Sequence, residues 1–134
     1  MNIMERIIDQ PLTDIVDAAH RASVTTPLPE LTGRLAALLG QTLTAFMVGM
    51  TSGRTIARWA EGENLPNKNS GVDEKLRTAY QVTELLTAAF SSSDVARAWL
   101  IGLNPRLDDM RPVEAIREGK LREVITAARD FATQ

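Results

Sequence analysis

The stretch that decides the fold reads QTLTAFMVGMTSGRTIARWAEGENLP and occupies residues 41–66. Its apolar residues recur every three or four positions on both sides of Gly49, and this spacing predicts two short helices joined by a turn. Glycine can take the positive φ angle that such a turn needs, and Thr51 or Ser52 can cap the second helix, expected over Thr51–Trp59. Together these features predict a helix-turn-helix.

The outer residues of the second helix are the candidates for contacting DNA. In a helix-turn-helix, the N-terminal residues of this helix reach base edges in the major groove, while its inner face holds it on the core. Arginine side chains bridge two acceptors of guanine or bind phosphate, and serine and threonine hydroxyls can do either. Ile56 and Trp59 are expected to face inward. The predicted DNA-binding residues are Thr51, Ser52, Gly53, Arg54, Thr55 and Arg58.

The charge balance argues against strong DNA binding by a single chain. Residues 28–71 contain four Lys and Arg residues against three Glu residues, and the whole chain has a net charge of −2. A DNA-binding domain usually presents a basic face, because each phosphate contact releases counterions and adds affinity. Two interpretations stay open: the motif binds DNA with the help of a dimer or a partner, or it is two core helices with a polar exterior.

The rest of the sequence predicts an all-α protein with almost no sheet. Apolar residues follow the helical spacing, and aromatic residues make up only 4%. The run of residues 104–112 after Gly102 is expected to be irregular, because two prolines lie close together there among turn formers. We expect a helical arm over residues 1–27, a helix-turn-helix domain over 28–71 and a small helical C-terminal domain over 72–134. Within these parts, helices are expected at about 28–39, 72–90, 93–101, 112–118 and 121–131.

The N-terminal arm is expected to be an amphipathic helix, in which Pro11 either begins a new helix or kinks this one. The β-branched, proline-ended residues 23–27 are expected to form an extended connector. Two interpretations of the arm stay open: it folds back on the core, or it associates with a second copy of the chain. The residues predicted for self-association are Ile7, Ile8, Leu12, Ile15 and Val16.

The amino-acid composition excludes several kinds of metal site and catalytic site. The chain has no cysteine and a single histidine, His20, so cysteine-ligated metals, thiol nucleophiles and most histidine-dependent sites are excluded. Asp108 and Asp109 are the nearest approach to a paired-carboxylate site, but adjacent acids beside a turn are usually solvated. We therefore expect no enzyme activity, no metal, no cofactor and no small-molecule substrate. The first residues lack the features of a signal peptide and no apolar run could span a bilayer, so a cytoplasmic location without membrane contact is expected.

The motifs that follow the helix-turn-helix occur in a distinctive order. They are Trp99-Leu100, Asn104-Pro105-Arg106-Leu107, Arg111-Pro112-Val113-Glu114-Ala115-Ile116 and Gly119-Lys120-Leu121-Arg122-Glu123-Val124. With the helix-turn-helix before them, they resemble the Xre/MbcA/ParS antitoxin family over about residues 30–131. The resemblance implies an Xre-type helix-turn-helix followed by a small helical toxin-binding domain.

The resemblance also implies a function and partners. Members of this family neutralise a RES-type toxin that destroys NAD by covering its active site, often in a higher-order complex, and some repress their own operon. A RES-type toxin, operator DNA and a second copy of the chain are therefore the expected partners. Carried over by motif, Trp99 and Asn104 are expected to shape the toxin-binding domain, where Asn104 turns the chain. The resemblance also leads us to expect exposed cations near the partner, namely Arg106, Arg111, Arg117 and Arg122. The alternative is a free-standing or phage-type repressor that uses the helix-turn-helix without a toxin partner.

Overall fold

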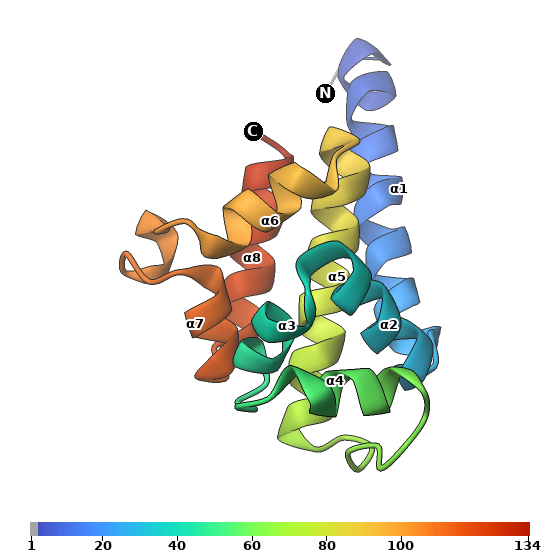
Figure 1. The fold of residues 1–134 in the computed structure, drawn as a ribbon. Coiled ribbons are helices and arrows are strands. Elements are labelled where there is room, and N and C mark those ends of the chain that lie inside the picture. The colour runs from blue at the N-terminus through green and yellow to red at the C-terminus, as the bar shows by residue number, and fades with distance from the viewer. Residues whose placement is uncertain (1–2) are drawn as a thin grey trace.

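Helix α5, Gly71–Phe90, lies at the centre of the molecule, with α1 along one side and α8 along the other (Figure 1). The computed structural model describes the backbone of residues 3–134 and the side chains from residue 11 onward. Within that part there are eight α-helices, one 3-10 turn and no strand, so the all-α prediction is confirmed. The other elements are α1 Ile3–Thr25, α2 Leu28–Leu39, α3 Gln41–Met47, α4 Gly53–Ala60, α6 Ser93–Ile101, η1 Pro105–Leu107, α7 Pro112–Arg117 and α8 Leu121–Ala132.

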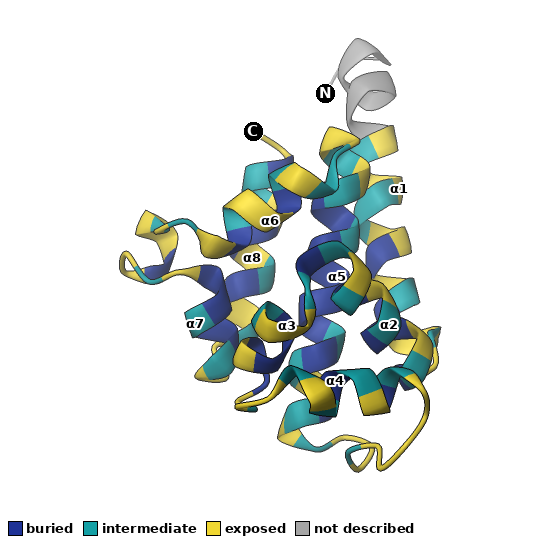
Figure 2. Ribbon diagram, viewed as in Figure 1, coloured by how far each residue is buried: buried dark blue, intermediate teal, exposed yellow. Residues whose placement is uncertain are grey.

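Helix α5 is central because its apolar residues point in several directions. Leu76, Val82 and Leu86 are completely buried, and α1, α2, α6 and α8 all pack against this helix (Figure 2). Buried residues from all three expected parts of the chain belong to one hydrophobic cluster, which includes Ala19, Ile56 and Val124. Over residues 3–134, none of the helices combines the length and apolarity needed to cross a bilayer.

Serine residues set the starts of three helices. The side chains of Ser52, Ser70 and Ser92 accept hydrogen bonds from backbone N–H groups in the first turns of α4, α5 and α6. Such caps satisfy amides that have no partner inside the helix. The expected start of the second motif helix at Thr51 was therefore wrong by two residues, because Ser52 is extended and caps α4, which begins at Gly53.

The arm is more helical than expected. Helix α1 contains Pro11, so of the two alternatives a new helix at Pro11 was wrong. The helix continues to Thr25, so the expected extended connector was wrong over residues 23–25, and only Thr26 and Pro27 lie outside the helices. The Ser23 hydroxyl donates to the His20 carbonyl, and the Thr25 hydroxyl donates to the Arg21 carbonyl. Ser23 is also buried against α5, where its hydroxyl contacts Gln81 at 3.5 Å. Tertiary packing here outweighs the weak helix propensity of β-branched residues.

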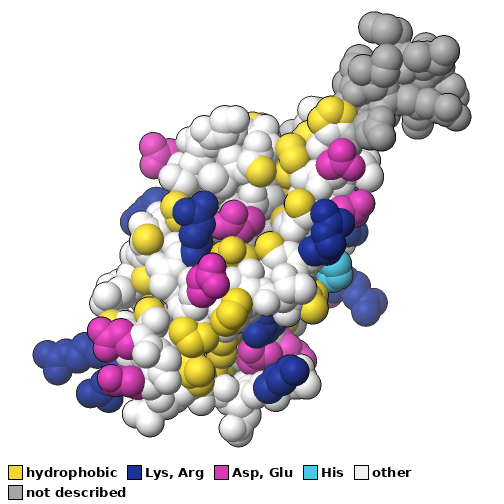
Figure 3. Space-filling model, turned by 90° about the vertical axis from the view of Figure 1, so that its right-hand side faces the viewer, with side chains coloured by type: hydrophobic (Ala, Val, Ile, Leu, Met, Phe, Trp, Pro, Cys, Tyr) yellow, Lys and Arg dark blue, Asp and Glu magenta, His cyan; other side chains and the backbone are white. Residues whose placement is uncertain are grey.

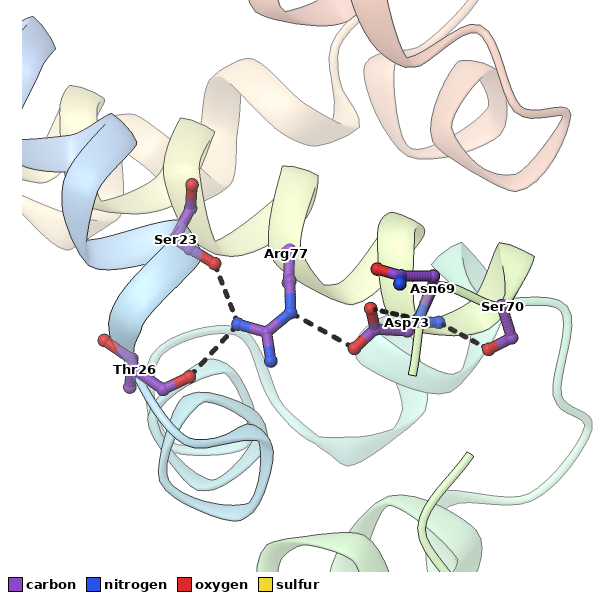
Figure 4. A network of polar contacts seen from close by, with 6 residues as sticks. All are labelled: Ser23, Thr26, Asn69, Ser70, Asp73 and Arg77. Carbon is purple, nitrogen blue, oxygen red and sulfur yellow. Dashed lines mark hydrogen bonds and ion pairs between the residues drawn. The ribbon is translucent and has the colours of Figure 1, made fainter. Parts of the chain in front are cut away.

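The end of α1 is fastened to α5 by a polar network (Figure 4). Arg77 Nη1 donates to the carbonyls of Ser23 and Thr26, at 2.9 and 3.1 Å. Arg77 Nε contacts Asp73 Oδ1 at 3.1 Å, and the second carboxylate oxygen of Asp73 accepts from the Asn69 backbone N–H. Asp73 is only 3% exposed. This network therefore joins the last turn of α1, the start of α5 and the loop before α5.

Among the described residues, three other arginines likewise donate to carbonyls at the ends of helices other than their own. Arg97 donates to Leu39 O of α2, Arg117 to Phe46 O of α3, and Arg111 to Ile101 O of α6. Helices α1, α2, α3 and α6 have no basic residue in their own last turns. Because the last carbonyls of a helix lack partners and carry partial negative charge, a cation from elsewhere stabilises them.

Candidate functional site

The turn between α3 and α4 has the geometry expected from its sequence. Gly49 has a φ angle of +80°, which confirms the prediction that glycine is needed there. The backbone N–H of Met50 donates to the Ala45 carbonyl at 2.9 Å, and the Met50 side chain packs against the core. Val48 is buried. The turn is thus held by both a hydrogen bond and apolar contacts.

Helix α4 separates an inner from an outer surface. Ile56 and Trp59 are buried, as predicted, and Trp59 Nε1 donates to the Asn64 carbonyl at 3.0 Å, which ties the following loop to the helix. Thr51, Ser52, Arg54 and Arg58 are exposed, whereas Thr55 is partly buried. Four of the six predicted DNA-binding residues therefore lie fully at the surface.

Gly53, the sixth of these residues, serves the packing of α3 on α4. A Cβ atom at this position would stand 3.0 Å from the Cβ of Gln41, closer than nearly all real contacts between side chains. The absence of a side chain at Gly53 therefore lets the starts of the two helices approach each other. Because the role of Gly53 is in packing, the side chains available to a ligand on this surface are those of Thr51, Ser52, Arg54 and Arg58.

Arg54 and Arg58 are exposed cations on helix α4. They lie four residues apart on α4, so their side chains leave the same face of the helix. Among the described residues, neither side chain forms an ion pair or a hydrogen bond, although Arg34, Arg77, Arg97, Arg106, Arg111 and Arg117 all do. Two cations without intrachain partners are free to meet a negatively charged ligand.

A second candidate surface lies where α5, α6 and α8 meet. The rings of Phe90 and Phe131 have centroids 5.0 Å apart, and Trp99 stacks on Phe131 at 6.2 Å. Phe90 is 40% exposed and Leu103 is 64% exposed, so apolar groups reach solvent near the partly buried Phe131 and Trp99. A shallow pocket of about 340 Å³ is lined by Trp99, Leu103, Asn104, Pro105, Arg106, Ala127, Phe131 and Gln134. We call Phe90, Trp99, Leu103 and Phe131 the aromatic surface.

The irregular segment beside this surface has a defined shape. Asn104 Oδ1 accepts from the Arg106 backbone N–H, and the backbone N–H of Asn104 donates to the Met110 carbonyl at 3.1 Å. Between them, Leu107 is buried, and Asp108 and Asp109 are exposed with positive φ angles. Asn104 thus turns the chain, and the adjacent acids belong to an exposed turn.

The four predicted partner-binding arginines have different surroundings. Arg106 Nη1 pairs with Asp130 at 2.7 Å, and Arg111 holds the end of α6 and contacts Glu114. Arg117 donates to Phe46 O at 2.8 Å. Arg122 is exposed and, in the described part of the chain, has no partner. Three of the four arginines therefore have intrachain partners that hold them in place.

The residues predicted for self-association are only partly available. The side chains of Ile7 and Ile8 lie outside the part of the chain that the structure describes. Ile15 and Val16 are partly buried against the core, and Leu12 is partly buried as well. In the described part of α1, the apolar stripe thus faces α5, which is the helix that α1 contacts most extensively.

Three members of the aromatic surface, Phe90, Leu103 and Phe131, were not among the predicted site residues. Phe90 and Phe131 lie at the ends of expected helices, and Leu103 lies just before the segment expected to be irregular. Leu103 did carry a usable signal, because it is an apolar residue between Gly102 and Asn104 in a stretch of turn formers. Phe90 carried none, because its exposure depends on how α6 and α8 meet the end of α5.

The described side chains include no cluster of three or more His, Asp or Glu residues that could hold a metal ion. No family model and no curated protein matches the sequence, and no solved structure matches the fold. The resemblance to the antitoxin family therefore stays a prediction.

Proposed function

We propose that this chain is a non-catalytic antitoxin of the Xre/MbcA/ParS type, which neutralises a RES-type toxin by covering its active site. The observation that carries the proposal is the aromatic surface. Three of its four residues, Trp99, Leu103 and Phe131, lie in the segment from Trp99 onward, in which the sequence resembles the toxin-binding domain. Aromatic and large aliphatic residues that reach solvent together are the usual anchors of a protein interface.

The surroundings of the aromatic surface suit binding of a folded partner. The neighbouring segment is fixed by the Asn104 and Met110 backbone contact, by the Arg111 bond to Ile101 O and by the Arg106 pair with Asp130. A surface that is ordered before binding loses less conformational entropy when the partner docks. In this proposal Leu103 and Trp99 are the anchors, and the arginines maintain the shape around them.

Co-expression tests the proposal. The chain is expressed together with a RES-type toxin, and growth and cellular NAD are measured. Neutralisation is expected with the wild-type chain and is expected to be lost with Leu103→Asp, which puts a charge at the centre of the interface. Leu65→Asp, at an exposed leucine between α4 and α5, is the matched control and should neutralise normally. A toxin that stays active beside the wild-type chain contradicts the proposal.

A second function, repression of transcription, is favoured by the unpaired Arg54 and Arg58 on α4. In this proposal the two guanidinium groups contact bases or phosphates of operator DNA, and the low positive charge of the motif makes binding weak in a single chain. Gel shifts with DNA from upstream of the gene, at low salt, test it. Arg54→Ala and Arg58→Ala should abolish the specific shift, whereas Arg129→Ala, at an exposed arginine of α8, should not. Absence of any shift with the wild-type chain would argue against this function.

A further inference from the structure

The outer face of α1 carries charges of opposite sign at its two described ends. Asp14 and Asp17 come first, and Arg21 follows one to two turns later; all three are exposed. None of them pairs with another described residue. Figure 3 shows this side of the molecule, with acidic side chains nearer the described start of α1 and basic ones farther along. Asp14, Ala18 and Arg21 fall on one stripe of the helix, because residues four and seven apart share a face.

A groove runs beside this stripe, between α1 and α5. Its volume is about 360 Å³, and it is lined mostly by apolar and small residues, namely Asp14, Ile15, Ala18, Ala19, Ala22, Glu84 and Ala88. Small side chains allow the backbone of another helix to approach closely. The Glu84 carboxylate on the rim is occupied, because Arg34 Nε contacts it at 2.8 Å. This contact raises the pKa of Arg34, since the hydrogen bond and the charge of Glu84 both favour the protonated form. Asp14 is thus the unpaired charge of the groove.

We propose that α1 of a second copy of this chain packs antiparallel on this stripe and groove, with Asp14 of each copy beside Arg21 of the other. Asp14 and Arg21 are two helical turns apart, about 10 Å along the axis. A two-fold axis that passes between residues 17 and 18 therefore brings Asp14 of each copy opposite Arg21 of the other. An interface formed about a two-fold axis must be self-complementary. The pair of Asp14 and Arg21 meets this condition, because each acidic group faces a basic group of the other copy. A parallel pair would instead place like charges together.

Of the residues predicted for self-association whose side chains are described, Leu12, Ile15 and Val16, only Ile15 lines this groove. Ile15 and Val16 pack on the chain's own core, whereas Asp14, Ala18 and Arg21 point outward. The proposal does not depend on a toxin or on DNA, so it can fail while the proposed function stands. If it holds, the pairing also places two copies of α4 in one particle, which would compensate for the few cations of a single motif.

Sedimentation equilibrium of the full-length chain over a concentration series tests the proposal. The wild-type chain is expected to dimerise, and to do so more weakly in high salt, because exposed ion pairs are screened. Arg21→Asp alone, and Asp14→Arg with Asp17→Arg, should each weaken the dimer at least about tenfold, because each places like charges together at two symmetric sites. Arg129→Asp makes the same charge change on α8 and should leave dimerisation unchanged. Far-UV circular dichroism checks that every variant is folded.

The decisive experiment mixes the two charge-reversed variants. The Arg21→Asp chain and the Asp14→Arg, Asp17→Arg chain, differently tagged, should form a heterodimer although neither forms a homodimer. Placing all three substitutions in one chain should restore the homodimer, since the charges are exchanged. A wild-type chain that is monomeric at all concentrations overturns the proposal. Equal weakening by Arg129→Asp, or two weakened variants that do not bind each other, overturns it as well.

Discussion

The guanidinium group of Arg117 lies over the ring of Phe46, 4.7 Å from its centroid, and donates to the carbonyl of the same residue at 2.8 Å. Phe46 is in the last turn of α3 and Arg117 is the last residue of α7, so the two residues are 71 positions apart in the chain. One side chain thereby satisfies a helix C-terminus and forms a cation–π contact. The C-terminal part of the chain thus helps to hold the first helix of the predicted helix-turn-helix.

Replacing Arg117 with alanine is expected to lower the free energy of unfolding by about 2 kcal/mol, the lower end of the sum of a charged hydrogen bond and a cation–π contact, because both contacts are exposed. Lysine should recover part of this loss, because it keeps the charge but not the planar guanidinium. Urea denaturation monitored by circular dichroism measures the effect. Arg122→Ala is the control, since Arg122 is exposed and has no partner among the described residues. Equal stability of the two alanine variants would contradict the assigned role.

Replacing Arg77 with alanine is expected to cost more, about 3 kcal/mol, because it leaves the buried Asp73 carboxylate without its cation and two carbonyls without a donor. Asp73→Asn should cost less, since an amide oxygen can still accept from the Asn69 N–H. A double-mutant cycle measures the coupling between the two residues. Additive effects of Arg77→Ala and Asp73→Asn would show that the pair is not coupled and would contradict this interpretation.

Structural features that depend only on residues close together in the chain could be predicted from the sequence. Gly49, Ile56 and Trp59 have the conformation and burial expected from them, because turn geometry and helical spacing are local properties. The end of α1 was mispredicted because Ser23 packs against α5, a contact between residues 58 positions apart. Propensity scales describe residues without such contacts.

The surroundings of the predicted sites were harder to foresee than the fold class. Nothing near Arg111 or Arg117 in the sequence shows that their side chains hold the ends of α6 and α3. Both are surface cations by composition alone, and they were predicted to contact a partner on that basis. Arg54 and Arg58 could be placed correctly because they depend only on the face of one short helix.

Three glycines offer a comparison of backbone and packing effects. Gly49→Ala should destabilise the protein by about 1 kcal/mol, because φ is +80° although the surrounding space is open. Gly53→Ala should destabilise it through the 3.0 Å approach of the new Cβ atom to Gln41. Gly71→Ala meets neither obstacle and should be neutral or stabilising by about 0.5 kcal/mol. Thermal and urea unfolding rank the three variants, and a destabilised Gly71→Ala would contradict the argument.

The central claim is that the aromatic surface binds a RES-type toxin, and titration calorimetry of the purified chain with the purified toxin tests it most directly. The wild-type chain should bind, Leu103→Asp should weaken binding at least about tenfold, equivalent to about 1.4 kcal/mol, and the Arg54→Ala, Arg58→Ala double variant should bind like the wild type. Absence of binding by the wild-type chain, or an affinity unchanged by Leu103→Asp, would contradict the claim.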